Sequence, residues 1–386
     1  MDYGGNASGQ LTPISTGVSG SYLLTVQGRK VGVFKPVSEE PFTRSPPEER
    51  RALKSGITWG DFPTKEVSAY LLDHDGFAGV PPTIAPHVTT RKDGAVLAIQ
   101  SAALRVPSSC PCLCHTGEEE RWKRHEAPVR TEAGSLQAYE DHECTADDIG
   151  TAAFDPEQVH RIGVLDLRIL NLDRHEGNLL VARRASPAGW KDSDSKNQWR
   201  LVPIDHSYSL PDWRDHSDVW FCWAGWKQAK MPFSAATRRY IRRLNPLKDA
   251  KLLHSLGVKT NEIISMILST RLLQLCTAAG FCLADIAALV QRDVMHPHTL
   301  SALETLARRA AREAGWQARN GNHLLAQTQG KNYNVREDHR SVGVSDVFHL
   351  FLSRFEYHAA QLILEWRRDS APVPPRLGGN KAVAPL

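Results

Sequence analysis

The chain has 386 residues, of which 41% are hydrophobic and 23% are charged, and its formal net charge is +4. This composition is typical of a globular protein with an ample core, and the small net charge argues against a nucleic-acid partner. No apolar run approaches the roughly 18 residues needed to span a bilayer, and the first residues lack the pattern of a signal peptide. Seven cysteines at unpaired spacings favour a reduced, intracellular setting over a disulfide framework.

The N-terminal region predicts strands and one helix. Residues 17–37 hold two apolar, strand-like runs joined by a turn at Gln27 and Gly28, which predicts a hairpin with a glycine-rich entry. Residues 63–73 have apolar side chains at helical spacing, so a helix follows the hairpin. Further strands are expected at 79–90 and 94–101.

The middle of the chain begins with a predicted insertion and then becomes helical. Residues 106–134 combine Pro, Cys and His with a charged run, as is typical of an insertion loop. Long apolar-periodic patterns then predict helices at 157–172, 261–279, 282–293, 298–314 and 344–368. The Pro- and Gly-rich residues 370–386 predict a disordered tail.

This order of elements predicts a two-lobed α+β architecture. Residues 1–139 are expected to form a small, strand-rich N-lobe that includes the insertion loop, and residues 140–369 a larger helical C-lobe. The join, near residues 134–141, is the natural place for a ligand-binding cleft.

A charged stretch, DRHEGN, begins at Asp173 and lies between two apolar runs. The apolar runs at 179–184 and 199–205 are separated by turn-forming residues, which predicts an antiparallel pair. Such pairing brings Asn178, just before the first run, beside Asp205, at the end of the second. An amide oxygen beside a carboxylate suits Mg²⁺, which takes a few protein oxygens together with phosphates. Since Asp173 is a candidate for orienting or deprotonating a hydroxyl, the stretch predicts a phosphoryl-transfer site.

The N-terminal region supplies the complementary groups. In STGVSGSY, residues 15–22, Gly17 and Gly20 leave the backbone amides free to approach phosphate. Lys35 ends an alternating strand on the face beneath this turn, where its ammonium is expected to reach the α- and β-phosphates of a nucleotide. Glu66, on the helix that follows, is a candidate to pair with Lys35 and fix its position.

The order of these groups along the chain is that of a kinase: a glycine turn, a Lys on a strand, a Glu on a helix, an Asp/Asn loop and a metal-binding Asp. The stretches that carry them resemble the phosphatidylinositol 3/4-kinase superfamily, and within it the type II phosphatidylinositol 4-kinases of the plant gamma-like branch. The matching stretches, which span roughly residues 12–290, are VGVFKPVSEEP, KEVSAYLLDHDGFAGVPPT, AGSLQAY, LDLRILNLDRHEGNLLV, LVPIDHSYSLPD and CWAGWKQAKMPFS.

The resemblance implies a protein-kinase-like fold that binds ATP in the cleft between its lobes. It implies that Glu66 is the ion-pair partner of Lys35 and that the adenine lies against residues 135–139. The ATP contacts that it implies are Thr16, Gly17, Ser19, Gly20, Ser21, Lys35, Gln137 and Tyr139.

For the catalytic loop, the resemblance implies that Asp173 acts on the acceptor hydroxyl. It implies that Asn178 and Asp205 bind Mg²⁺. His175 occupies a position where lipid kinases of this superfamily use a His close to the attacking hydroxyl or the γ-phosphate. Orientation of Asp173 or capping of the loop is the alternative role for His175.

Two positions depart from the family pattern without removing a catalytic group. Ser207 stands where the family usually has Gly, and it limits backbone freedom beside the metal-binding Asp. Lys227 stands where the family commonly has Pro.

The expected reaction is transfer of the ATP γ-phosphoryl group to phosphatidylinositol, which makes phosphatidylinositol 4-phosphate. A lipid acceptor is favoured because no APE-type element follows Asp205. The expected setting is cytoplasmic, with peripheral contact with cytosolic membrane faces. Two alternatives stay open: a Ser/Thr protein kinase of the same superfamily, and a catalytically dead nucleotide-binding scaffold, for which Ser207 is the support. Because the glycine turn lies near the first residue, the ubiquitin-like domains of plant relatives are not expected.

Three further segments have more than one interpretation. The run SSCPCLCH, residues 108–115, fits a plain insertion loop, an acylation site or a metal site with His115. The basic segment 237–248 is predicted to be helical and fits either anionic lipid headgroups or a solvated surface. The aromatic segment 220–226 favours the helical core over a membrane wedge.

Overall fold

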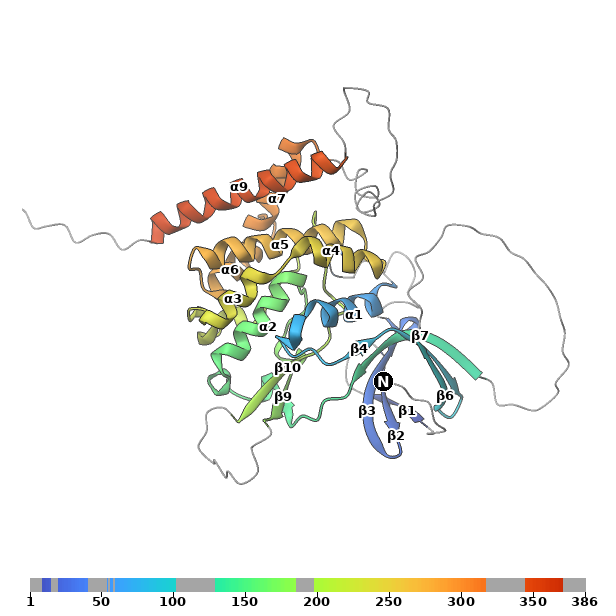
Figure 1. The fold of residues 1–386 in the computed structure, drawn as a ribbon. Helices are drawn as coiled ribbons and strands as arrows, with labels where there is room; N and C mark the ends of the chain where they lie inside the picture. Colours follow the sequence, from blue (N-terminus) through green and yellow to red (C-terminus); the bar gives the residue numbers. More distant parts are fainter. Residues whose placement is uncertain are drawn as a thin grey trace, which may run out of the picture.

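The chain folds into a strand-rich N-terminal part and a helix-rich C-terminal part (Figure 1). The structure is a computed structural model, and it describes residues 9–14, 20–40, 54, 56–57, 60–101, 129–184, 198–316 and 344–370. The mixed helix and strand content that the sequence predicts is confirmed. No helix in these described ranges is both long enough and apolar enough to cross a membrane.

Seven N-terminal strands form an antiparallel sheet, in which six close into a barrel and the seventh, β4, pairs with β7 alone. They are β1 (Gly9–Ile14), β2 (Ser21–Val26), β3 (Arg29–Pro36), β4 (Thr83–Ile84), β5 (Pro86–Arg91), β6 (Ala95–Ser101) and β7 (Val129–Ala138). The strand order is β3-β2-β1-β6-β5-β7-β4, and an additional β3–β7 pairing closes the ring. The predicted hairpin is β2–β3, and its turn residues Gln27 and Gly28 have φ of 51° and 75°, as a two-residue primed turn requires.

Strand β7 corrects the predicted insertion loop 106–134. Residues 129–134 are not loop but the first part of β7, in which residues 129–133 pair with β5 and Gly134 pairs with Pro36 of β3. The adjacent run of charged residues hid the strand pattern, since β7 is largely exposed at this end and carries few apolar side chains. The other residues of the predicted loop, with the Cys-rich run 108–115, lie outside the described residues, as does the predicted tail from 371 onward.

The C-terminal part consists of helices and a small sheet. The helices are α2 (Pro156–Ile169), α3 (Ala235–Arg243), α4 (Pro246–Ser255), α5 (Thr260–Ala278), α6 (Leu283–Val290), α7 (Ala302–Ala314) and α9 (Val344–Ser370). The small sheet has the order β10-β9-β8, from β8 (Cys144–Thr145), β9 (Leu179–Arg183) and β10 (Trp199–Pro203).

The helix boundaries differ from the sequence predictions where caps decide them. Helix α2 ends before the predicted residue 172 because Leu170 adopts a left-handed conformation (φ 47°). Helix α7 begins after the predicted residue 298 because the Ser301 hydroxyl accepts a hydrogen bond from the Glu304 N–H. The basic segment 237–248 is not one helix: it breaks at Asn245, which caps α4.

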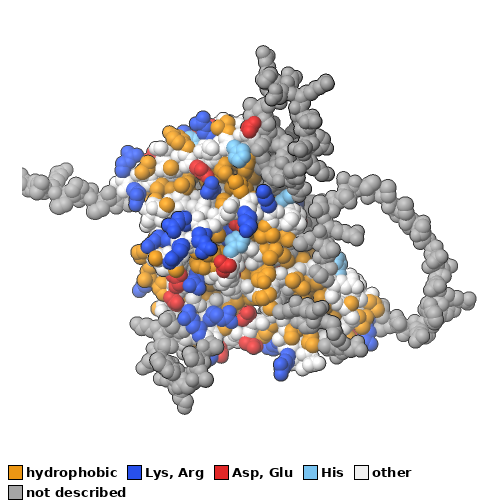
Figure 2. Space-filling model, viewed as in Figure 1, with side chains coloured by type: hydrophobic (Ala, Val, Ile, Leu, Met, Phe, Trp, Pro, Cys, Tyr) orange, Lys and Arg blue, Asp and Glu red, His pale blue; other side chains and the backbone are white. Residues whose placement is uncertain are grey.

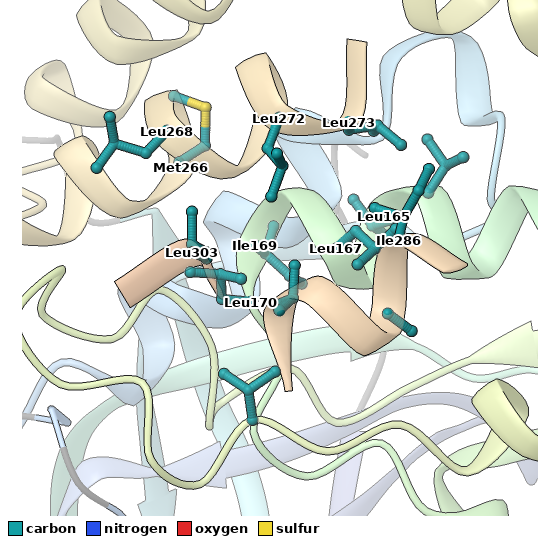
Figure 3. Packing of buried hydrophobic residues seen from close by; sticks show 14 of the residues in the cluster. Leu165, Leu167, Ile169, Leu170, Met266, Leu268, Leu272, Leu273, Ile286 and Leu303 are labelled. Carbon is teal, nitrogen blue, oxygen red and sulfur yellow. The ribbon is translucent and has the colours of Figure 1, made fainter. Parts of the chain in front are cut away.

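The core of the helical part lies around α2 and α5. Helix α5 is buried over most of its surface and packs against α2, α4 and α9. Figure 3 shows how side chains of α2, α5, α6 and α7 meet there, among them Leu165, Leu167, Ile169, Met266, Leu268, Leu272, Leu273, Ile286 and Leu303. Full burial of one such side chain contributes about 2 kcal/mol, so this core fixes the end of α2 firmly.

Helix α1 (Phe62–Leu72) joins the barrel to the helical part. It begins and ends one residue earlier than the predicted helix, 63–73. The buried Lys65 Nζ lies 3.0 Å from Glu262 Oε1 of α5 and donates a hydrogen bond to the Leu210 carbonyl oxygen at 2.7 Å. Both charged side chains are almost fully buried, so neither carries a full hydration shell. The pair therefore ties α1 to α5.

Loss of this buried pair should destabilise the fold. We expect Lys65→Met to lower the free energy of unfolding by about 3 kcal/mol, because it leaves Glu262 charged and buried without its partner. Urea unfolding of wild type and variant measures this difference. Lys259→Met removes the more exposed Lys259–Asp61 pair and should cost less than about 1 kcal/mol. Equal losses in the two variants would contradict the assigned role of Lys65.

Candidate active site

Lys35 stands at the centre of the site and contacts carboxylates from two other elements. It lies near the end of β3, on the face opposite the buried Phe34. Its Nζ is 2.9 Å from Glu66 Oε1 of α1 and 2.9 Å from Asp205 Oδ1 after β10. Burial alone would lower the pKa of Lys35, but the two carboxylates outweigh it and raise the pKa above its usual value. Lys35 therefore stays charged at neutral pH.

Glu66 is held at both of its carboxylate oxygens. While Oε1 pairs with Lys35, Oε2 accepts a hydrogen bond from the backbone N–H of the fully buried His206 at 3.1 Å. Burial would raise the pKa of Glu66, but Lys35 and His206 together hold it well below its usual range. The sequence-predicted partners Lys35 and Glu66 are thus in contact, and Glu66 is ionised.

Asp205 adopts a conformation that is unusual for a residue with a side chain. Its φ is 54°, in the left-handed region. Its carboxylate accepts a hydrogen bond from Ser207 Oγ at 2.8 Å and also contacts Lys35. Such a conformation costs about 1–2 kcal/mol and is typical of functional sites, where the surrounding contacts hold it. Ser207, which departs from the family pattern, here binds the neighbouring carboxylate directly.

The loop of Asp173 and Asn178 meets Asp205 as the hairpin pattern predicts. Strands β9 and β10 pair with Leu179 opposite Pro203, and the Ile204 N–H donates to the Asn178 carbonyl oxygen at 3.1 Å. Asn178 Nδ2 in turn donates to the Asp173 carbonyl oxygen at 2.9 Å. The structure therefore brings the loop and the end of β10 together.

Arg174 holds this loop in place through hydrogen bonds of its buried side chain. Sequence analysis did not identify this role. Its buried guanidinium contacts both Asp166 oxygens through Nε (3.0 and 3.1 Å). Its Nη1 donates to the carbonyl oxygens of Asn178 (2.6 Å) and Ile204 (2.8 Å). Asp166 also accepts a hydrogen bond from Trp223 Nε1 at 2.9 Å. The one signal in the sequence was an Asp within the apolar pattern of the helix.

Asp173 has its backbone and its carboxylate held by different groups. Asn171 Oδ1 accepts a hydrogen bond from the Asp173 N–H at 2.9 Å, and the exposed His175 donates its backbone N–H to the Asp173 carbonyl oxygen at 2.9 Å. The carboxylate contacts Lys54 Nζ, which also donates to the Leu172 carbonyl oxygen at 2.7 Å. Sequence analysis missed Lys54, because no periodic pattern or motif marks its polar segment.

Five of the eight predicted nucleotide contacts, Gly20, Ser21, Lys35, Gln137 and Tyr139, are among the described residues. A Cβ at Gly20 would lie 1.8 Å from Glu39 Oε2, so a side chain there would force Glu39 to move. Gln137 pairs with Val33 of β3, and the Tyr139 N–H donates to the Val31 carbonyl oxygen at 3.1 Å. Ser21 begins β2. Three predicted contacts, Thr16, Gly17 and Ser19, lie outside the described residues.

A small cavity lies between Gly20 and Lys35. Its lining includes Gly20, Lys35, Glu39, Glu40, Glu66 and Ser207. Glu40 is buried there, and its Oε2 accepts a hydrogen bond from the Gly60 N–H at 2.8 Å. Burial raises the pKa of Glu40 to about 6. The cavity is therefore lined by carboxylates around one ammonium.

The donor set of Asn178 and Asp205 fits a partial Mg²⁺ site. The described residues contain no group of three or more His, Cys, Asp or Glu that could hold a metal by itself. Mg²⁺ needs no such cage, because it commonly binds one or two protein oxygens together with phosphate oxygens and water. Because Asn178 Nδ2 is turned to Asp173, the amide oxygen is the atom that it can offer a metal.

The sequence of the chain matches that of a known family of kinases. Residues 19–286, more than half of the chain, match the family described as phosphatidylinositol 3- and 4-kinase, and the chain belongs to this family. It is 34% identical over 312 residues to phosphatidylinositol 4-kinase gamma 8 of Arabidopsis thaliana, a match that covers 78% of this chain and 53% of the relative.

A second relative from the same plant extends this similarity. The chain is 35% identical over 310 residues to phosphatidylinositol 4-kinase gamma 1 of Arabidopsis thaliana. This match covers 77% of this chain and 50% of the relative. The resemblance to the plant gamma kinases that the sequence motifs indicated is thereby confirmed. The chain spans about half the length of the curated relatives it matches.

The raised pKa of Glu40 predicts a pH dependence of stability. The native state keeps the Glu40 proton up to about pH 6, whereas the unfolded chain releases it near the ordinary value of 4.5. The free energy of unfolding should therefore fall as the pH rises through this window, by about 2 kcal/mol at about 1.4 kcal/mol per pKa unit. Urea unfolding between pH 4.5 and 6 measures it, and Glu40→Gln should lose this part of the slope. Identical slopes in both proteins would contradict the prediction.

Proposed function

We propose that the chain is an ATP-dependent phosphatidylinositol 4-kinase. The observation that carries the proposal is the contact of Lys35 with both Glu66 and Asp205, next to the loop of Asp173 and Asn178. Membership of the phosphatidylinositol 3- and 4-kinase family supports a phosphoinositide as the acceptor. The names of the relatives, both phosphatidylinositol 4-kinases, support the 4-kinase assignment.

The proposed architecture is the two-lobed kinase fold, with the barrel and α1 as the small lobe and the helices from α2 onward as the large lobe. Lys35 comes from the small lobe, whereas Asp173, Asn178 and Asp205 come from the large lobe. An acceptor and a nucleotide that bind between the lobes would thus be held from both sides. This placement supports transfer within an enclosed site.

The side chains divide the work of phosphoryl transfer by position. An ammonium has three N–H donors, and the contacts of Lys35 with Glu66 and Asp205 leave the third for a phosphate oxygen. Asp173 orients the acceptor hydroxyl and takes its proton as the bond to phosphorus forms. Asn178 and Asp205 would hold Mg²⁺, which when bound neutralises charge on the phosphates. His175 is placed beside Asp173 on the exposed side of the loop.

The proposed setting is the cytoplasm, with peripheral contact with an anionic membrane face. The exposed residues Arg239, Arg242 and Arg243 lie on α3. Figure 2 shows Lys and Arg side chains gathered on the face where Figure 1 places this helix. Such a group attracts anionic headgroups by about 1 kcal/mol per charge near the surface. Aromatic side chains of residues 220–226 contribute less, since Phe221, Trp223 and Trp226 are buried in the core and Trp220 is the exposed one.

The activity is tested by transfer of labelled phosphate from Mg-ATP. Wild type should label phosphatidylinositol in detergent micelles, and Asp173→Asn should reduce this by at least about 100-fold, because the oriented base is lost. Asp346→Asn, the same change at an exposed position on α9, should leave the rate unchanged.

The acceptor decides between the proposal and its alternatives. Label in a generic protein acceptor and not in lipid would replace the lipid kinase by a Ser/Thr protein kinase. If neither acceptor is labelled while nucleotide binding is retained, the proposed lipid kinase would have to be replaced by a catalytically dead scaffold.

A further inference from the structure

A second lysine, Lys54, reaches the catalytic loop from a distant part of the chain. Its Nζ contacts Asp173 Oδ1 and donates to the Leu172 carbonyl oxygen at 2.7 Å. It also lies 5.6 Å from the centre of the Tyr208 ring, where a cation is attracted by the ring face. Burial and the Asp173 and Asp205 charges raise the pKa of Tyr208 to about 12, so the ring stays neutral. Three groups of the large lobe thus surround one ammonium.

The turn that carries Lys54 is docked on the segment that follows Asp205. The Ile57 N–H donates to the Lys54 carbonyl oxygen at 3.3 Å, and the Asp212 N–H donates to the Gly56 carbonyl oxygen at 2.9 Å. Ile57 packs against the hydrophobic core. The position of Lys54 is therefore fixed by backbone contacts and by packing.

Gly56 shows how closely this turn approaches its neighbour. Its φ is 76°, which favours glycine, and a Cβ there would lie 2.6 Å from the Asp215 carbonyl oxygen. A side chain at this position would push the turn away from the segment 211–215. The close approach thus depends on the glycine.

Lys54 differs in position from the lysine already assigned. Lys35 is engaged by Glu66 and Asp205 on the nucleotide side, whereas Lys54 contacts Asp173, the residue assigned to the acceptor hydroxyl. Hydrogen bonds to Asn171, Asn178 and His175 fix the backbone of Asp173. They do not set the rotation of its carboxylate, which is 30% exposed and meets Lys54.

We propose that Lys54 is a positioning residue that holds the Asp173 carboxylate in the orientation that receives the acceptor hydroxyl. The inference rests on the proposed phosphotransferase function. Phosphoryl transfer depends chiefly on positioning, because the protein does little covalent chemistry itself. A misplacement of about 1 Å can cost up to about 100-fold in rate, so loss of the ammonium should reduce turnover while substrate binding is kept.

The test compares Lys54→Met with wild type in the transfer assay, with kcat and both KM values measured. We expect kcat to fall by about 10-fold, with the KM for ATP and the KM for the acceptor within about twofold of wild type. Lys54→Arg keeps the positive charge and should recover most of the rate. In the Asp173→Asn background, Lys54→Met should cause no further loss, because a residue that acts through Asp173 has nothing left to position.

Two control variants separate this role from a general effect on the fold. Lys259→Met breaks an exposed ion pair with Asp61 elsewhere in the structure and should leave kcat unchanged. Gly56→Ala keeps Lys54 but displaces its turn, and should lower kcat in the same direction as Lys54→Met. Thermal unfolding of each variant checks that the fold is kept.

The outcomes distinguish this inference from the proposed function. An active wild type with unchanged kcat in Lys54→Met would overturn the inference alone. A higher KM for the acceptor at unchanged kcat would also overturn it, because Lys54 would then bind the acceptor and not position Asp173. A wild type that transfers phosphate to neither lipid nor protein would overturn the proposed function and this inference with it.

Discussion

The geometry of the site depends on one ammonium shared by two carboxylates. Lys35 belongs to the barrel, Glu66 to the helix that joins the barrel to the rest, and Asp205 to the segment after β10. A partly buried charge of this kind is stable only when it is paired, so each of the three groups holds the other two in place. Asp205 keeps a left-handed backbone within this arrangement. Removal of Lys35 would leave both carboxylates without this charge partner in a low-dielectric setting, whereas removal of one carboxylate would leave Lys35 paired with the other.

Helix α1 transmits this constraint to the helical part. Its neighbouring residues Lys65 and Glu66 form ion pairs with different parts of the molecule: Glu66 with the barrel, and Lys65 with Glu262 of α5. Helix α5 packs in turn against α2, whose end positions the loop of Asp173 and Asn178. Buried ion pairs and packing therefore set the distance between Lys35 of the barrel and the groups of the helical part. Lys35 already contacts Asp205, so no induced closure is needed to bring them together.

The sequence predicted the parts of this site that local patterns encode. Strand alternation placed Lys35, helical spacing placed Glu66, and the two apolar runs around a turn-forming loop brought Asn178 to the end of β10. The closure of the barrel was not predictable, because it depends on the pairing of β3 with β7, which lie about a hundred residues apart, and β7 has a weak strand pattern of its own. The roles assigned to these residues stay predictions until activity is measured.

The groups that the sequence did not reveal act through tertiary contacts. In the sequence, Arg174 belongs to a charged stretch. In the structure it is buried against Asp166, and this contact exists only once α2 and the loop have folded together. Sequence analysis assigned no role to Lys54, yet a docked turn brings it to Asp173. In both cases the role of the side chain depends on the residue that it contacts in the folded chain. A periodic pattern in the sequence does not show such a contact.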